Sequence, residues 1–174
     1  MKDQVLTPWL YRRWTFDFPA ELYPAVLERL RGTPARAEEI AGGLGADALI
    51  ACPDDGWSVQ RHIGHMGDLE RLMQDRLDAY ERGGAALPAA DMSNARTVAT
   101  DHDARAIGDV LSDFRTGRAA TMARLDACPR DFFGRSAWHE RLGVQKRVVD
   151  TCVFFADHDD HHLALIRTAI NQTR

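Results

Sequence analysis

Two histidines near the C-terminus have the spacing of metal ligands on a helix. His158 and His162 lie inside an apolar stretch of about 25 residues that contains neither proline nor glycine, which predicts one long helix. At 100° per residue the two imidazoles lie about 40° apart on one face, one helical turn from each other. A divalent ion bound there needs at least one further ligand from elsewhere in the chain.

Two more histidines, His62 and His65, are candidates for that further ligand. They lie near the start of a helix predicted over residues 58–82, which Ser58 caps and Gly83-Gly84 ends. If this helix is antiparallel to the last one, its first turns lie at the level of the C-terminal pair. On a helical wheel His62 is nearer to the centre of the apolar face, and His65 lies at its edge. Spacing alone leaves both candidates open.

Amphipathic helices account for most of the chain. The first starts near Pro19, is interrupted at Gly32-Thr33-Pro34, and restarts through Ala41. Two others are predicted over residues 58–82 and 103–127, followed by the C-terminal helix. No alternating pattern typical of a strand occurs, so we expect an all-α fold, a four-helix bundle.

The longest connection predicts the topology of the bundle. Residues 83–101 contain proline, glycine and alanine with little periodicity. Extended, they span roughly 60 Å, whereas a helix of about 24 residues is roughly 36 Å long. The connection is therefore long enough to cross back along the bundle and leave the second and third helices parallel. This crossover gives an up-down-down-up arrangement.

Composition limits the classes of function. The 174 residues fit a single domain, 1–174, with an aromatic-rich N-terminal arm at 1–18 that packs across the helices. A net charge of −4 without a basic block argues against nucleic-acid or membrane partners. No signal peptide or membrane span is apparent, and the three scattered cysteines fit reduced thiols, so we expect a cytoplasmic protein.

Three segments, at residues 30–36, 57–70 and 158–162, resemble the DinB/YfiT-like superfamily of metal-binding four-helix bundle proteins. The resemblance covers most of the chain and implies the up-down-down-up bundle, commonly as a homodimer. In that family one metal-binding histidine follows a Trp-Ser or Trp-Thr pair, here Trp57-Ser58, eight residues after its first member. Two more come from an H-x-x-x-H on the last helix. The resemblance therefore implies a metal site formed by His65, His158 and His162.

Other polar residues are expected around that site. His62 and His161 are predicted to lie beside the ligands, at the back or the rim of the site. Asp159 lies about 100° round the helix from His158 and is expected to orient a histidine, while Asp160 is expected to face solvent. Two histidines lie outside both motifs and are expected in loops or on the surface: His102 and His139.

Three histidines leave a divalent ion, with zinc or nickel as the expected metals, at least one open coordination position, as in catalytic sites. No other catalytic motif occurs in the sequence. We therefore expect a metal-bound water or thiolate to be the reacting group. The superfamily includes bacterial thiol-dependent S-transferases and proteins described as metal-dependent hydrolases. The resemblance thus implies a transferase or hydrolase acting on a small electrophilic substrate, with a low-molecular-weight thiol as a candidate co-substrate. The alternative is a non-catalytic, stress-associated metal-binding bundle.

Overall fold

The computed structural model describes residues 6–53 and 56–172 of the chain. Short 3₁₀ turns occur beside the regular elements, among them Trp9–Tyr11 and His102–Ala104. The helices are α1 Tyr23–Gly42, α2 Ala46–Ile50, α3 Val59–Asp68, α4 Glu70–Glu81, α5 Ala95–Thr100, α6 Ile107–Asp126 and α7 Val148–Gln172, and the strands are β1 Ser136–His139 and β2 Val144–Arg147.

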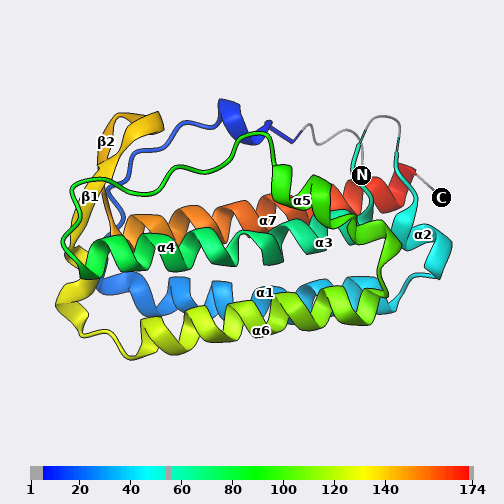
Figure 1. Ribbon diagram of the computed structural model, residues 1–174, viewed down its shortest axis with the longest axis horizontal. Helices are drawn as coiled ribbons and strands as arrows, with labels where there is room; N and C mark the ends of the chain where they lie inside the picture. The colour runs from blue at the N-terminus through cyan, green and yellow to red at the C-terminus, as the bar shows by residue number, and fades with distance from the viewer. Residues whose placement is uncertain (1–5, 54–55, 173–174) are drawn as a thin grey trace.

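Four helical rods form the bundle that the sequence predicts. Figure 1 shows α1 and α7 running one way, with the α3–α4 rod and α6 running the other way, so the order is up-down-down-up. The segment between α4 and α6 returns along the length of the bundle and contains α5 (Figure 1). Both the fold class and the crossover are thus confirmed. Within the described residues, no helix has the length and apolarity needed to cross a membrane.

The first helix differs from its prediction because α1 is continuous through Pro34. Proline has no N–H to donate to the carbonyl four residues earlier, which is that of Leu30. Arg118 of α6 fills the gap, since its Nη1 donates to Leu30 O at 2.6 Å. The expected interruption at residues 32–34 is therefore wrong, because another helix supplies the missing hydrogen bond.

The second rod begins and ends where the sequence predicts. The Ser58 side chain accepts a hydrogen bond from the backbone N–H of Arg61, as an N-cap does. Gly83 stops the rod with a φ of +64°, a left-handed conformation that glycine adopts without strain. The rod is divided into α3 and α4 at Leu69, which keeps a right-handed helical conformation, so the direction of the rod continues through it.

Two elements in the connections were not predicted. The β1–β2 hairpin lies where we expected an irregular link, with Gly143 in the left-handed conformation at its turn. Its strands are four residues long, too short for alternation to be recognised in the sequence. Helix α5 is one of the shortest helices of the fold and lies in the crossover, where it contacts α3. Both elements border the site described below.

The N-terminal arm packs along α7. Trp9 and Trp14 each lie against Phe154, with ring centroids 4.9 and 4.8 Å apart. Phe16 and Phe18 also contact the larger of the two apolar core clusters. Residues 1–5 of the predicted arm lie outside the described residues. The arm therefore covers one side of the last helix, beside the histidines.

Candidate metal centre

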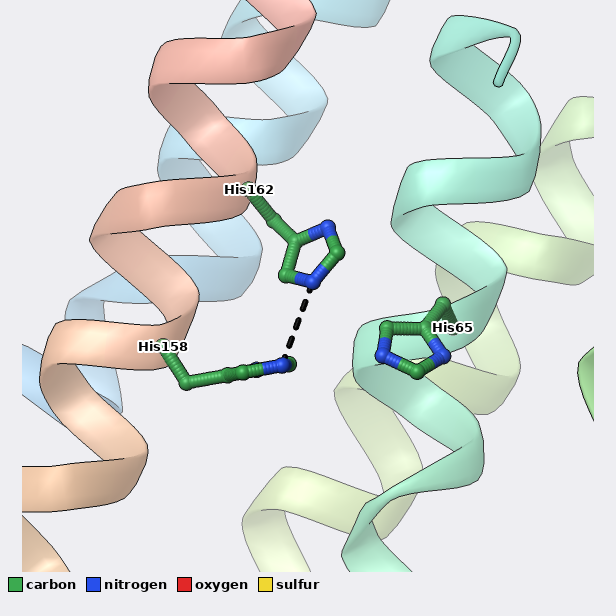
Figure 2. Close-up of side chains that lie close together, drawn as sticks. All are labelled: His65, His158 and His162. Atoms are coloured by element: carbon green, nitrogen blue, oxygen red, sulfur yellow. Dashed lines mark hydrogen bonds between the residues drawn. The ribbon is translucent and has the colours of Figure 1, made fainter. Parts of the chain in front are cut away.

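Three histidines from two helices converge on one point. His65 projects from α3, and His158 and His162 project from successive turns of α7 (Figure 2). One ring nitrogen from each lies within 4.8 Å of the others. The Nε2 atoms of His158 and His162 are 3.2 Å apart. The structure thus brings together the set that the family resemblance implies, and it places His65 rather than His62 in the cluster.

The spacing of these nitrogens fits a small divalent ion. Two imidazole nitrogens bound to zinc at 2.0–2.1 Å with tetrahedral angles lie about 3.3 Å apart. The observed 3.2 Å between Nε2 of His158 and Nε2 of His162 is close to that value. The third histidine, His65, has a ring nitrogen within 4.8 Å of those of the other two. The residues present therefore fit a metal ion.

The histidines are in the protonation state that metal binding requires. Burial, with a smaller contribution from His102, lowers the pKa of His65 to about 4 despite the opposing effect of Asp68. Burial and the neighbouring histidines place the pKa values of His158 and His162 well below their ordinary range. Neutral imidazole offers a lone pair, so at pH 7 the cluster presents ligands rather than repelling cations.

A chain of hydrogen bonds fixes the orientation of His65. Its Nδ1 lies 3.0 Å from the hydroxyl oxygen of Thr97, in α5. That hydroxyl donates to Asp68 at 2.9 Å, so its oxygen accepts from Nδ1–H of His65 and leaves Nε2 for a metal. Asp68 also accepts from Arg96 and contacts Nε2 of His102 at 2.9 Å. These bonds outweigh burial and lower the pKa of Asp68, which keeps it ionised.

The other two histidines are held differently. Nδ1 of His162 is 2.9 Å from Nδ1 of His62, so His62 lies behind the cluster as expected. Nδ1 of His158 is buried and has no hydrogen-bond partner in the described part of the chain. The His158 ring is instead packed edge-on against Trp9 of the arm, with centroids 5.0 Å apart. Trp57 packs against His65 in the same way at 5.0 Å. Two tryptophans therefore flank the cluster.

The cluster lies in the wall of a cavity of about 230 Å³. The α3–α4 rod, α7, the arm, the crossover and the hairpin all contribute to its lining. Besides the three histidines, its walls include Trp9, Leu10, Trp57, Leu69, Leu72, Arg76, Asp91, Met92, Arg141, Phe154, Phe155 and His161. Leu10 and Met92 are exposed and mark its mouth. We call this space the histidine cavity.

His161 belongs to the rim of this cavity. Its Nδ1 accepts a hydrogen bond from Arg12 at 3.0 Å, which leaves its own proton on Nε2. Burial and the Arg12 charge lower the pKa of His161 to about 4. His161 is therefore a neutral hydrogen-bond donor near the cluster.

The expectations for the two aspartates require correction. Asp159 does not lie against a histidine. Its carboxylate accepts from Arg118 of α6 at 2.7 Å, because its position about 100° round α7 from His158 turns it away from the histidine pair. Asp160 does not simply face solvent, since it pairs with Arg29 and Arg36 of α1. Both aspartates hold α7 in the bundle.

His102 and His139 are also corrected, because both are buried rather than on the surface. His102 fits against Gly64, where any side chain would collide with its ring. Sequence reasoning missed the Thr97 and Asp68 support of His65. Asp68 follows His65 by three residues and so shares its side of the helix, which is the one local signal for its role.

The chain is similar to known proteins in sequence pattern and fold. The sequence model of the DinB superfamily matches residues 29–166. No curated protein sequence matches the chain. YfiT from Bacillus subtilis, described as a probable metal-dependent hydrolase with an unusual four-helix bundle topology, has a TM-score of 0.80 at 16% identity, covering 93% of both chains. A mycothiol-dependent maleylpyruvate isomerase has a TM-score of 0.66 at 12% identity, covering 87% of this chain and 62% of that chain. At such identities the two structures establish a shared fold.

Proposed function

The chain belongs to the DinB superfamily, and from this membership and its three-histidine cluster we propose that it is a divalent-metal-dependent enzyme acting on a small molecule. One observation carries the proposal: the nitrogens of His65, His158 and His162 converge within 4.8 Å at the wall of a cavity. The proposed ligands are these three residues, and zinc or nickel is the proposed ion.

The number of ligands favours catalysis over a purely structural role. Structural zinc sites are usually closed by four protein ligands, whereas catalytic sites keep a position open. Here three ligands face a cavity, and the described residues contribute no fourth. When bound in such a site, a divalent ion lowers the pKa of a coordinated water or thiol and so supplies a nucleophile at neutral pH.

The residues around the cluster have defined parts in this proposal. Thr97 and Asp68 orient His65 so that its Nε2 would be free to hold an ion, and the contact of His62 with Nδ1 of His162 would leave Nε2 of His162 free as well. Trp9 and Trp57 pack against the rings of His158 and His65 and support them from the side. His161 keeps a proton on Nε2 and offers a hydrogen bond to a bound molecule at the rim.

Thiol-dependent S-transfer is the most concrete version of the activity, and hydrolysis is the second. Two facts support these classes: one solved relative is described as a probable metal-dependent hydrolase and another as a mycothiol-dependent isomerase. The cavity volume of about 230 Å³ suits a small molecule.

The test is turnover of a model electrophile by metal-loaded protein in the presence of bacterial thiols. We expect stoichiometric metal in the loaded protein and thiol conjugation that His158→Ala abolishes. His161→Gln serves as the control for metal content alone, because it changes a histidine of the same helix outside the proposed ligand set. Bound metal without turnover of thiol or ester substrates would support a non-catalytic metal-binding bundle instead. Absence of bound metal, with His158→Ala behaving like wild type, would contradict both.

A further inference from the structure

The histidine cavity contains a buried arginine that has no acidic partner. Arg76 projects from α4 and is 1% exposed. Its Nε donates to the carbonyl of Pro88 at 3.1 Å, and one terminal nitrogen lies 3.4 Å from Nε2 of His139. Within the described residues no carboxylate forms an ion pair with it. Both of its recorded acceptors are uncharged, since burial followed by nearby positive charges lowers the pKa of His139 to about 4.

A buried guanidinium without a counter-ion lowers the stability of the folded state, and another buried arginine of this protein does have counter-ions. Arg118, the other deeply buried arginine, pairs with both Glu70 and Asp159. Burial lowers the pKa of Arg76 to about 10, so it still carries its charge at pH 7. The charge of Arg76 is therefore left for something other than the described protein residues to neutralise.

The surroundings of Arg76 add positive charge instead of removing it. Arg141 of the hairpin turn is exposed and lines the same cavity, with no ion pair recorded in the described part of the chain. Burial, followed by the charge of Arg76, places the pKa of Lys146 well below its ordinary value, and Lys146 offers Arg76 no counter-charge. The carboxylate in the lining, Asp91, accepts hydrogen bonds from Ser93 and the N–H of Ala95 in its own loop. This end of the cavity therefore attracts anions.

The position of Arg76 relates this charge to the histidines. His65, Leu69, Leu72 and Arg76 follow one another along the same side of the α3–α4 rod, and all line the cavity. From residue 65 to residue 76 the rod rises about 16 Å. Phe155 lies between the two ends on α7, with the Arg76 guanidinium 5.7 Å from its ring centre. The cavity thus has a histidine end, an apolar middle and a cationic end.

We propose that Arg76 binds a carboxylate of the substrate or co-substrate, with Arg141 assisting at the mouth. The molecule that fits is a short apolar stem with a carboxylate at one end and the reacting thiol or electrophile at the other. The identity of the reacting end rests on the proposed function. The carboxylate subsite itself rests on the cavity and the unpaired guanidinium.

The first test compares two probes of equal length on metal-free, chelator-treated protein: hexanoate and its neutral amide, hexanamide. Trp9 and Trp57 line the cavity, so quenching of their fluorescence reports binding, and calorimetry gives a second measure. We expect hexanoate to bind about thirtyfold more tightly, as a charge-assisted bidentate contact predicts. Equal binding of the two probes, or binding of neither, would overturn the proposal.

Substitutions test whether the preference for hexanoate over hexanamide depends on Arg76. Arg76→Gln is expected to reduce hexanoate binding to the level of hexanamide, and Arg76→Lys to recover part of it. Arg141→Gln, at an exposed position that does not threaten folding, is expected to weaken hexanoate binding about threefold to fivefold, as for a partly screened charge. Arg71→Gln is the matched control, because Arg71 lies on the same helix, is exposed and pairs with Asp75. If circular dichroism shows that Arg76→Gln is unfolded, hexanoate binding by Arg76→Lys and Arg141→Gln decides whether the preference depends on Arg76. A hexanoate preference unchanged in the folded variants would contradict the assignment.

The metal-free design separates this inference from the proposed function. If the protein binds no metal but still prefers hexanoate in an Arg76-dependent way, the subsite stands and the metal-dependent activity fails. If metal-dependent turnover is found without any carboxylate preference, the activity stands and the subsite fails.

Discussion

Helix α7 presents two kinds of buried polar surface only one residue apart. Asp159 points towards α1 and α6, into what we call the arginine network: Arg118, Glu70, Asp159 and Thr121. His158 points towards α3 and the arm, into the histidine cavity. In the network one guanidinium pairs with two carboxylates and a backbone carbonyl, and Glu70 also accepts from the Thr121 hydroxyl. In the cavity two imidazole nitrogens face each other, and the Arg76 guanidinium pairs with no acidic side chain of the described residues.

The difference separates what holds the fold from what is available to a ligand. A buried polar group contributes to stability only when its hydrogen bonds and charge are matched within the protein. The network meets that condition from four helices at once. The histidine cavity leaves Nδ1 of His158 and the charge of Arg76 unmatched by described residues. Unmatched groups around a cavity indicate a site completed by something bound there.

The largest effect is expected from removing the centre of the network. Arg118→Met leaves the buried carboxylates of Glu70 and Asp159 without their cation. It also leaves the Leu30 carbonyl without a donor, because Pro34 has no backbone N–H. We expect a loss of about 3–5 kcal/mol in the free energy of unfolding, measured in urea at pH 7. Arg115→Gln is the control on the same helix. Its exposed pair with Glu38 should be worth less than about 1 kcal/mol. Similar losses of unfolding free energy in the two variants would contradict the view that the arginine network holds the fold.

The next effect concerns metal rather than the fold. Zinc at about a hundredfold over its dissociation constant should stabilise the protein by about 2.7 kcal/mol. His158→Ala should cost less than about 1 kcal/mol without metal, because His158 is half-buried and its Nδ1 has no partner. The same variant should lose the zinc stabilisation entirely, whereas His161→Gln should keep it. Unfolding in urea with and without zinc measures both quantities. Zinc stabilisation that survives in His158→Ala would contradict the proposed ligand set.

A smaller effect is expected from the residues behind His65. Thr97→Val removes the oxygen that accepts from Nδ1 of His65, and Asp68→Asn removes the charge behind it. Each should weaken zinc binding about tenfold to a hundredfold, measured by competition with a chelating dye. Thr100→Val is the matched control, since Thr100 lies in the same short helix and its hydroxyl bonds only its own backbone, at Arg96. Equal affinities in Thr97→Val and Thr100→Val would show that the chain of bonds does not position His65.

Local sequence was enough for the features that depend on neighbouring residues. The long apolar helix, the Ser58 cap and the glycine at position 83 each act within a few residues of chain, and all were predicted correctly. Periodicity also predicted the bundle, and the length of the connection at residues 83–101 predicted its crossover. The choice of His65 over His62 needed the family resemblance, because both are buried on α3 and the helical wheel left both candidates open.

The features that were missed depend on residues far away in sequence. Arg118 donates to the carbonyl of Leu30, 88 positions earlier, and so supports the continuous α1. It also pairs with Asp159, 41 positions later, on the side of α7 that faces α6. Thr97 reaches His65 only because the crossover folds a short helix against α3, and no local pattern signals that contact. Arg76 was unremarkable as one of many charged residues on a helix. Its significance lies in the absence of an acid around it, which only the folded arrangement reveals.

The smallest predicted effect tests the cationic end of the cavity through pH. His139 has a pKa of about 4 in the folded protein because of burial, followed by the charges of Lys146, Arg76 and Arg141. In the unfolded chain its pKa is about 6.5. Between these values the unfolded state binds the proton and the folded state does not, so stability is complete above about pH 6.5 and is lost as the pH falls towards 4.

His139→Gln should remove this contribution, because glutamine does not titrate and its carbonyl oxygen can still accept from Arg76. The loss of unfolding free energy between pH 7.5 and pH 5.5 should therefore be about 1 kcal/mol smaller in the variant than in the wild type. The other buried histidines contribute equally to both proteins and cancel in the difference. Thr100→Val is the control, because the Thr100 hydroxyl bonds the backbone of its own helix, and it should leave the difference between the two pH values unchanged. A wild-type pH dependence in His139→Gln would mean that His139 takes up its proton in the folded state. The cationic end of the cavity would then be weaker than its unpaired charges indicate.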